Sequence, residues 1–521
     1  MKTSIKSTLD RFEAMKAARN PWEARWREIA RYVAPTRDDF QTGAASMGRP
    51  PEEPKLFDAT AGIAAESLAS GIYGLMTNPA SPWFSLSTQH ADLEQDAQVR
   101  AWFREVEAAI RHALSAGGNR FYSQVPDFFR DLAAFGTGVF YVDQRRNRQT
   151  GAWEGLNFFA RPLSEVFVDQ DANGEVDTVY RRFTLTARQV RQSWPQAELP
   201  KIDKALEQGQ GDQAISLLHA VEPNLDYQPN KAGAAGKAFT SRYINLQDDS
   251  LIAAGGYQEL PYQVARWTVS RGSLYGASQA MLALPDIRTI NAMAKTSLLA
   301  AQKSVDPPIL VPNEVGMQGL KIHPGAVIVG GLDASGRRMY EPITLGSDVK
   351  ISLEMENQRR GAIKEAFHAS LLMMMDAPKM TATEFLGRQD ENMRLLAPYL
   401  GRVQNEFLDP LLRRVYALLA RAGQIPTPPP AIASRPGFKI SYQSPLARAQ
   451  RTTEANAIMR SYQALAPLAE SAPQVMQHFD IDKAARSVAE AFGVPDGVLK
   501  SADEVASSRE QQQGAQHAPT P

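Results

Sequence analysis

Apolar positions in the first quarter of the chain recur every three or four residues, the spacing of a helix with one buried face. In NPWEARWREIARYVAP, Trp26, Ile29 and Val33 fall on one face, and Asn20 precedes them in a capping-box pattern. We therefore expect a helix that starts at Asn20 and stops at Pro35. Two further helices, the first of them rich in small residues, are predicted over 58–78 and 97–115.

From about residue 137 the apolar spacing changes to every second residue, which is typical of strands. The turn sequence DANGE (171–175) separates two of these segments. Strands are predicted in GVFYVDQ, LNFFARP, VFVDQ, VDTVYRRFTLT, AISLLHAVE, SRYINLQ and YQVARWTVS, and a short helix in TARQVRQSW. Together these segments predict an antiparallel sheet, open or barrel-like.

The helical spacing returns in two segments on either side of a short β-rich stretch. The first covers about 276–303 and the second about 350–372, where Glu356 and Arg360 form a favourable i,i+4 pair. Between them, VDPPILVPN and HPGAVIVGG indicate short strands. We expect two helices side by side with the β-rich stretch at their tip.

Residues 371–385 read LLMMMDAPKMTATEF, with four methionines around the chain breakers Asp376 and Pro378. Methionine is flexible and polarizable, so it suits both irregular cores and adaptable contact surfaces. One interpretation is a turn that fills a gap in the core. The other is a mobile apolar loop that faces something that slides past it.

The last third of the chain is predicted to be mainly helical. A capping box at Thr381 and Glu384 starts a long helix that runs to Gly423 and is bent by Pro398 and Pro410. The proline-rich stretch 425–437 is expected to be a stiff, extended linker. Helical segments are expected over about 447–506, followed by a disordered tail.

Composition limits the classes of protein that remain. The 521 residues carry 57 Lys and Arg and 57 Asp and Glu, so the formal charge is zero, and there is no cysteine. A tight nucleic-acid binder usually has a basic surplus, so this balance argues against strong DNA affinity without excluding DNA that passes by. Neither a signal peptide nor an apolar run of about 18 residues is found, so we expect a protein inside a cell or a particle.

A search for catalytic chemistry finds no convergent site. KAGAAGKAF fails the phosphate-loop pattern at Lys231 and Ala238, and GASQA (276–280) lacks the last glycine of a nucleophile elbow, so a helix start is expected there. The seven histidines are scattered and are interpreted as solvated or satisfied. We therefore predict no enzyme activity, no catalytic or metal-binding residues and no cofactor.

Several segments, taken in order, resemble one viral family. They are DATAGIAAESLASGIYGLMTNPASPWFSL, DQDANGEVDTVYRRFTLTARQV, VDPPILVPN with HPGAVIV, TATEFLGRQDENMRLLAPYLGRVQNEFLDPLLRRVYALLARAGQIP and DIDKAARSVAEAFGVPDGVLKSADEV. Together they resemble the head-to-tail connecting (portal) proteins of short-tailed, podovirus-type bacteriophages, over about residues 20–508.

The resemblance implies an α+β, mainly α portal fold assembled into a ring, usually of twelve subunits. It assigns 1–275 to a wing of N-terminal helices and antiparallel sheet, 276–305 and 350–372 to two stem helices, 306–349 to a β clip, 373–380 to a tunnel loop, 381–444 to a kinked wing-to-crown helix and linker, 445–506 to a helical crown and 507–521 to a disordered tail.

The resemblance also implies a function and contact residues. Double-stranded DNA would pass non-specifically through the channel during packaging and ejection. The loop facing it would contain Met373, Met374, Met375, Asp376, Pro378, Lys379 and Met380. The clip surface for docking would contain Pro307, Pro308, Asn313, His323, Pro324, Arg337 and Arg338.

The expected partners are the terminase packaging motor, tail adaptor and nozzle proteins, the major capsid protein and the scaffold, without membrane insertion. The expected location is the portal vertex of the virion, after assembly in the host cytoplasm. Two alternatives remain. One is a ring-shaped neck or tail adaptor without a packaging role. The other is an ATP-driven translocase, which would need the phosphate loop that KAGAAGKAF does not provide.

Overall fold

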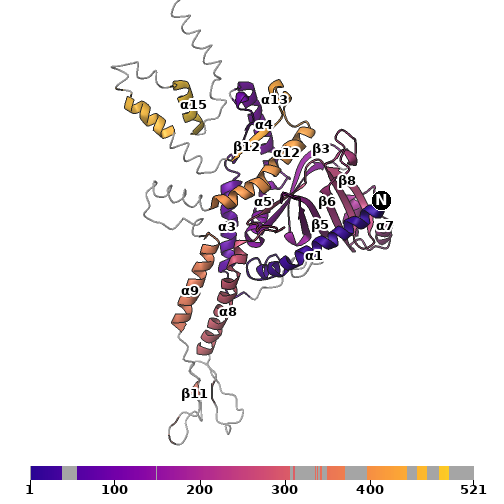
Figure 1. The fold of residues 1–521 in the computed structure, drawn as a ribbon. Helices are drawn as coiled ribbons and strands as arrows, with labels where there is room; N and C mark the ends of the chain where they lie inside the picture. The colour runs from indigo at the N-terminus through magenta and orange to yellow at the C-terminus, as the bar shows by residue number, and fades with distance from the viewer. Residues whose placement is uncertain are drawn as a thin grey trace, which may run out of the picture.

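A computed structural model defines the fold of this chain (Figure 1). The described residues are 2–37, 56–94, 96–147, 150–305, 349–369, 396–442, 455–465 and 480–491, with isolated positions at 309, 310, 335, 337, 341, 342 and 467. Most of the predicted clip, the methionine-rich stretch 371–385 and the predicted tail 507–521 lie outside the described residues.

The N-terminal helix α1 (Lys2–Tyr32) is much longer than the sequence suggested. The predicted start at Asn20 is wrong, because the helix runs through Asn20 and Pro21 without a break. Phe12 and Met15 are buried in the turns before the proline, as Trp26 and Ile29 are after it. Packing along the whole helix therefore outweighs the one hydrogen bond that Pro21 removes.

The predicted helices α3 (Thr60–Met76) and α4 (Ala97–Ser115) are confirmed. Asp96 caps α4 by accepting hydrogen bonds from the backbone N–H groups of Gln98 (2.8 Å) and Val99 (3.1 Å). Helix α5 (Phe121–Phe135) was not predicted, and most of its apolar residues belong to the main core cluster. Its Phe128 ring stacks on Phe407 at 4.0 Å between centroids.

Strands β2 to β9 form two open antiparallel sheets where one sheet, open or barrel-like, was expected. One sheet has the order β3-β2-β9 and the other β4-β5-β6-β7-β8. Their bounds are β2 (Thr137–Arg146), β3 (Trp153–Arg161), β4 (Val166–Gln170), β5 (Val176–Thr186), β6 (Ala214–Pro223), β7 (Phe239–Asn245), β8 (Ser250–Tyr257) and β9 (Tyr262–Arg266).

The five-stranded sheet is covered on both faces by helices. Tyr180 and Leu218 pack with Phe12 and Met15 of α1. Phe183, three strand positions from Tyr180 and therefore on the opposite face, lies in a second cluster. That second cluster joins the other face to two short helices, the predicted α6 (Ala187–Ser193) and the unpredicted α7 (Pro200–Glu207). This alternation is what the two-residue period of the sequence implies. Three-residue 3₁₀ turns lie at Ala91–Leu93, Leu163–Glu165 and Ala234–Gly236.

Helices α8 (Gln279–Val305) and α9 (Val349–Ala366) lie side by side and project from the body (Figure 1). The start of α8 confirms that GASQA opens a helix, while α9 ends at Ala366, earlier than the predicted residue 372. At the far end of the pair, β10 (Ile309–Leu310) and β11 (Glu341–Pro342) pair antiparallel, as expected for a short β-rich tip.

The helix after residue 396 changes its winding before Pro410. Residues 396–403 are α-helical, Gln404–Leu408 form a π-helical turn, and α12 (Asp409–Arg421) follows with Pro410 in its first turn. A proline ring clashes with the carbonyl four residues earlier in a regular helix, and the wider turn relieves that clash. The predicted apolar face is confirmed, since Leu400, Val403, Phe407 and their later counterparts are buried.

The proline-rich stretch 425–437 is not a free linker, contrary to expectation. It contains the short helix α13 (Pro430–Ser434), and the carbonyl of Pro426 accepts a hydrogen bond from Trp102 Nε1 at 2.9 Å. Strand β12 (Phe438–Tyr442) then pairs antiparallel with β1 (Phe84–Thr88), a contact that the sequence did not reveal. These contacts attach the stretch to the body.

Within the predicted crown, residues 455–465 and α15 (Ile481–Ala491) are helical. In the part of the chain that the structure describes, no helix combines the length and apolarity needed to cross a membrane.

Candidate functional site

A polar cluster, rather than an apolar seam, joins the middle of the α8–α9 pair. Glu356 is only 3% exposed; it accepts a hydrogen bond from Ser297 Oγ at 2.6 Å and one from Arg360 at 3.1 Å. Arg360 also donates to Asp58, just before α3, at 2.8 Å. Burial acts to raise the pKa of Asp58, but hydrogen bonds from Thr60 and Arg360 outweigh it and lower that pKa. The predicted Glu356–Arg360 pair is therefore confirmed as part of a larger network.

Two further hydrogen bonds join α8 to the N-terminal part of the chain and to α9. The backbone N–H of Phe57 donates to Asn291 Oδ1 of α8 at 2.9 Å. Arg359 of α9 donates to Asp286 of α8 at 2.6 Å. Hydrogen bonds need defined distances and directions, so the Arg359–Asp286 contact limits how far one helix can slide along the other, and the Phe57–Asn291 contact holds α8 on the body.

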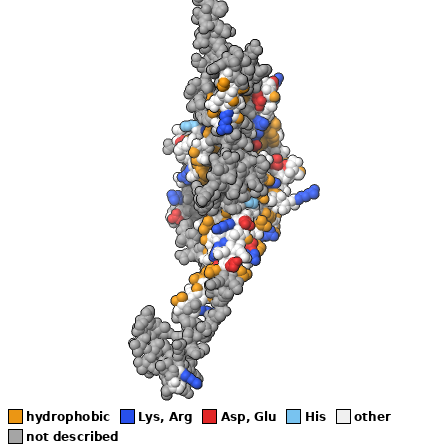
Figure 2. Space-filling view, turned by 90° about the vertical axis from the view of Figure 1, so that its left-hand side faces the viewer, with side chains coloured by type: hydrophobic (Ala, Val, Ile, Leu, Met, Phe, Trp, Pro, Cys, Tyr) orange, Lys and Arg blue, Asp and Glu red, His pale blue; other side chains and the backbone are white. Residues whose placement is uncertain are grey.

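The outer faces of the α8–α9 pair expose large apolar side chains. On α8, Leu298, Leu299 and Val305 are 49%, 45% and 87% exposed, and on α9 Leu353 and Met355 are each 48% exposed. Hydrophobic side chains are visible along this projecting part in the space-filling view (Figure 2). Exposed apolar side chains gathered on one part of a surface can mark a site of contact with another protein.

Two buried arginines attach the C-terminal helix to the three-stranded sheet. Arg266, at the end of β9, binds Glu406 of the π-helical turn at 2.9 Å, and Glu406 also accepts from the backbone N–H of Arg266 at 2.8 Å. Arg414 is 1% exposed and donates to the carbonyls of Val142 (2.8 Å) and Glu259 (2.9 Å). The helix that follows segment 370–395 is thus held at two points.

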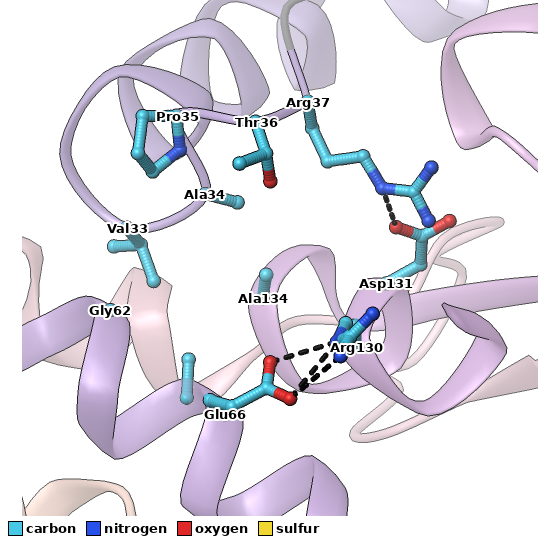
Figure 3. Close-up of a pocket in the computed structure, with 11 residues that line it drawn as sticks. Val33, Ala34, Pro35, Thr36, Arg37, Gly62, Glu66, Arg130, Asp131 and Ala134 are labelled. Carbon is cyan, nitrogen blue, oxygen red and sulfur yellow. Dashed lines mark hydrogen bonds and ion pairs between the residues drawn. The ribbon is translucent and has the colours of Figure 1, made fainter. Parts of the chain in front are cut away.

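A pocket of about 210 Å³ lies where the chain leaves α1 (Figure 3). Its charged lining residues occur as two ion pairs, Arg130–Glu66 at 2.8 Å and Arg37–Asp131 at 2.9 Å. The hydrogen bonds to Glu66 raise the pKa of Arg130. Since each charge is already paired with its counterion, these ion pairs serve to hold the end of α1, α3 and α5 together.

His219, on the middle strand β6 of the five-stranded sheet, has hydrogen-bond partners for both of its ring nitrogens. His219 Nδ1 lies 2.7 Å from the hydroxyl of Tyr262, its Nε2 lies 3.0 Å from Ser241 Oγ, and its ring stacks on Tyr243. Burial, followed by the charges of Arg181 and Arg161, lowers the pKa of His219 well below its ordinary value. His219 is a satisfied core histidine, as predicted.

Side-chain clusters that could bind a metal ion are the other candidate site. Among the described residues, no group of three or more His, Asp or Glu side chains is arranged to hold a metal ion.

The predicted contact residues fall mostly outside the described residues. This applies to the whole methionine-rich loop set and to Pro307, Pro308, Asn313, His323, Pro324 and Arg338. Arg337 is described and is exposed. The sequence reading missed the Arg266–Glu406 and Arg414 contacts, although a signal existed: Arg414 interrupts an apolar helical face between Leu411 and Leu418.

Comparison with known proteins gives one consistent result. A family described as "Bacteriophage head to tail connecting protein" matches residues 6–499. The chain is 28% identical to the "Probable portal protein" of Bordetella phage BPP-1, over 99% of this chain and 93% of that protein. It is 26% identical to the "Portal protein" of Salmonella phage epsilon15, over 98% of this chain and 91% of that protein.

Proposed function

Because this chain belongs to the family of bacteriophage head-to-tail connecting proteins, we propose that it is the portal of its phage. A ring of these subunits forms a channel at one vertex of the capsid, and double-stranded DNA is packaged and ejected through it. The observation that carries this proposal is the family match over 6–499, nearly the whole chain.

The arrangement of elements supports an assignment of parts. The α8–α9 pair, which projects from the body with β10 and β11 at its end, corresponds to the stem and the base of the clip. The two sheets with α1, α3, α4 and α5 correspond to the wing. Segment 373–380 is the tunnel loop, the helix through the π-turn leads from the wing, and 445–506 form the crown.

The ring itself is supported by the exposed apolar side chains of the α8–α9 pair. Fully burying an exposed large aliphatic side chain is worth about 1.5–3 kcal/mol, and most of these side chains, being about half exposed, would each contribute roughly half of that. A neighbouring copy presents the same pair, so the contact can repeat around a closed ring. The zero net charge of the chain suits a channel through which DNA slides without strong retention.

Electron micrographs and light scattering of the purified protein test the ring directly. Closed rings with an axial channel are expected, and monomers at every concentration and salt level would overturn the proposal. Since the chain has no cysteine, a Leu298→Cys variant carries one thiol. That thiol should react with a maleimide in dissociated subunits and be protected in rings.

The partners follow from the portal role and are also proposals. The clip would contact the terminase motor and the tail adaptor and nozzle proteins, and the wing would contact the major capsid protein and scaffold. Assembly would take place in the host cytoplasm and the final location would be the portal vertex of the virion.

The methionine-rich stretch has its own test. Replacing 374–379 by two glycines should leave rings intact and impair DNA packaging or retention if this stretch faces the channel. If the stretch fills a core, the same change should lower the thermal unfolding temperature and prevent ring assembly first. Measuring both quantities on one variant separates the two interpretations.

A further inference from the structure

Four segments that are distant in sequence meet around His368. Trp267 directly follows β9, Gln279 begins α8, His368 follows the end of α9, and Tyr399 lies in helix 396–403. The rings of Trp267 and Tyr399 stack at 4.8 Å with 1° between their planes, and the ring of His368 lies 6.0 Å from that of Tyr399. Gln279 Nε2 lies 3.0 Å from His368 Nε2.

The polar contact in this group fixes the state of the histidine. An amide nitrogen can only donate, so Gln279 Nε2 donates and His368 Nε2 accepts. The imidazole is then neutral, with its proton on Nδ1. Burial lowers the pKa of His368, in agreement with a neutral ring.

The backbone of His368 takes an unusual conformation for a residue with a side chain. Its φ is 53°, in the left-handed region, and its N–H donates to the carbonyl of Glu365 at 2.9 Å to end α9. Glycine is the usual residue at such a position, although asparagine and histidine also adopt it. The neighbours Phe367 and Ala369 are buried, at 0% and 2% exposure, so the turn is anchored on both sides.

The same group of residues brackets segment 370–395. Ala369 is the last buried residue before that segment, and Leu396, 1% exposed, is the first described residue after it. Both belong to the main core cluster. The contact between His368 and Tyr399 therefore joins the two ends of the chain from which 370–395 departs and to which it returns.

We propose that Trp267, Gln279, His368 and Tyr399 form a junction that sets the exit and re-entry points of segment 370–395 in each subunit, and so positions what that segment presents to DNA. The inference rests on the proposed portal function, which assigns the channel loop to 373–380. His368 and Tyr399 are positioning residues here, and neither is taken to contact DNA.

Three substitutions of His368 separate the side chain from the backbone conformation. His368→Asn keeps a residue that tolerates positive φ and a polar side chain. His368→Gly keeps the conformation but removes the side chain, and His368→Ala removes the side chain and strains the backbone. Tyr399→Phe, which keeps the stacking ring, is the matched control for the aromatic contact. Gln279→Met removes only the donor and serves as a second test that does not alter the turn.

The readouts are ring assembly, thermal unfolding, DNA-filled particles in a phage complementation assay, and the rate of tryptic cleavage at Lys379, Arg388 and Arg394. The Asn and Phe variants should package DNA like the wild type. The Gly and Met variants should form rings that unfold within a few degrees of the wild type. They should yield at least tenfold fewer filled particles and be cleaved several-fold faster in the segment.

Two results would overturn the junction. One is wild-type packaging and cleavage in His368→Gly and Gln279→Met. The other is an equal loss of ring stability in the Gly, Ala and Asn variants, which indicates a purely structural residue. Failure of the portal function is distinguishable, since wild-type rings would then not restore packaging in the complementation assay at all.

Discussion

Arg414 shows how one buried charge can hold an element in place. Its guanidinium group donates to two backbone carbonyls and lies over the ring of Tyr257, and Glu259 pairs with it at 3.3 Å. If the side chain is removed, the buried carbonyl of Val142 and the partly buried carbonyl of Glu259 lose this donor, and the loss at the buried carbonyl is the more costly.

Replacing Arg414 by alanine should therefore lower the free energy of unfolding by about 3 kcal/mol or more. Arg421→Ala is the matched control, because Arg421 pairs with the same Glu259 but is 42% exposed. Its loss should cost less than about 1 kcal/mol. Urea unfolding of both variants measures the difference, and equal costs would contradict the role given to Arg414.

His219 predicts how stability depends on pH. Burial lowers its pKa in the folded protein, whereas the unfolded chain has the ordinary value of about 6.5. Below that pH the unfolded state binds more protons, so stability is full above about pH 6.5 and falls as the pH drops toward the folded pKa. His368, whose pKa is also lowered, acts in the same direction.

Between pH 6.5 and 5.5 the free energy of unfolding should fall by up to about 1 kcal/mol through His219. A His219→Gln variant is less stable at every pH but should show a shallower slope. Urea midpoints at pH 7.5 and 5.5 give the slope, and an unchanged slope in the variant would assign the pH dependence to other groups.

Among the elements, Gly136 connects α5 to β2 at a point where another part of the backbone approaches closely. Its φ is 77°, and a Cβ atom there would lie 2.5 Å from the backbone of Gly276 and Ala277. These atoms belong to the turn before α8, so they cannot move aside independently. A glycine is required at this position both for its conformation and for the close approach.

Gly136→Ala should therefore destabilise the protein by about 3 kcal/mol or more, from the left-handed conformation and the collision together. Gly151→Ala is the control, since Gly151 also has a positive φ, 69°, but an added Cβ there meets no atom within 4 Å. Its cost should be about 1–2 kcal/mol. Thermal unfolding of the two variants compares them, and equal shifts would show that the close approach is unimportant.

The sequence predicted elements well where one face is apolar and the opposite face polar. Helix α4 and strand β3 have that contrast, whereas β2 and β6 are recognised by runs of consecutive buried residues. Helix α5 has the contrast too, since Phe121, Val125, Phe128 and Leu132 are buried at helical spacing while Ser123 and Arg130 are exposed. The signal for this helix was therefore present in the sequence and was missed. The first half of α1 was missed because Pro21 suggested a helix start, although the packing continues through it.

Contacts between distant segments were beyond the sequence. Strand β12 pairs with β1 across more than three hundred residues, and the His368 junction draws on four separate segments. Nothing local marks such pairs, because each side chain is ordinary in its own helix or strand. The methionine-rich stretch was readable from sequence, but its role stays a prediction.

At the scale of the whole molecule, changes to the exposed apolar side chains of the α8–α9 pair should weaken ring assembly without destabilising the subunit. A Leu298→Glu, Met355→Glu double variant introduces charges on side chains that are about half exposed in the single chain. The subunit should unfold at nearly the wild-type temperature, but ring formation should require at least tenfold higher protein concentration, because burial of these charges is costly.

Leu225→Glu is the control for that experiment, since Leu225 is 98% exposed and lies in the loop between β6 and β7, away from α8 and α9. Light scattering as a function of concentration measures assembly. Normal rings from the double variant would place the subunit contact elsewhere on the molecule.

In the proposed ring, the polar cluster around Glu356 would make each subunit's α8–α9 pair stiffer than the contacts between subunits. Inside one subunit, the bonds from Ser297 and Arg360 require a set alignment of the two helices, so shear within the pair breaks them. Apolar contact between subunits has no preferred direction and survives small sliding movements. Each α8–α9 pair would therefore move as a rigid unit. A change in channel diameter would require the pairs of neighbouring subunits to slide relative to one another.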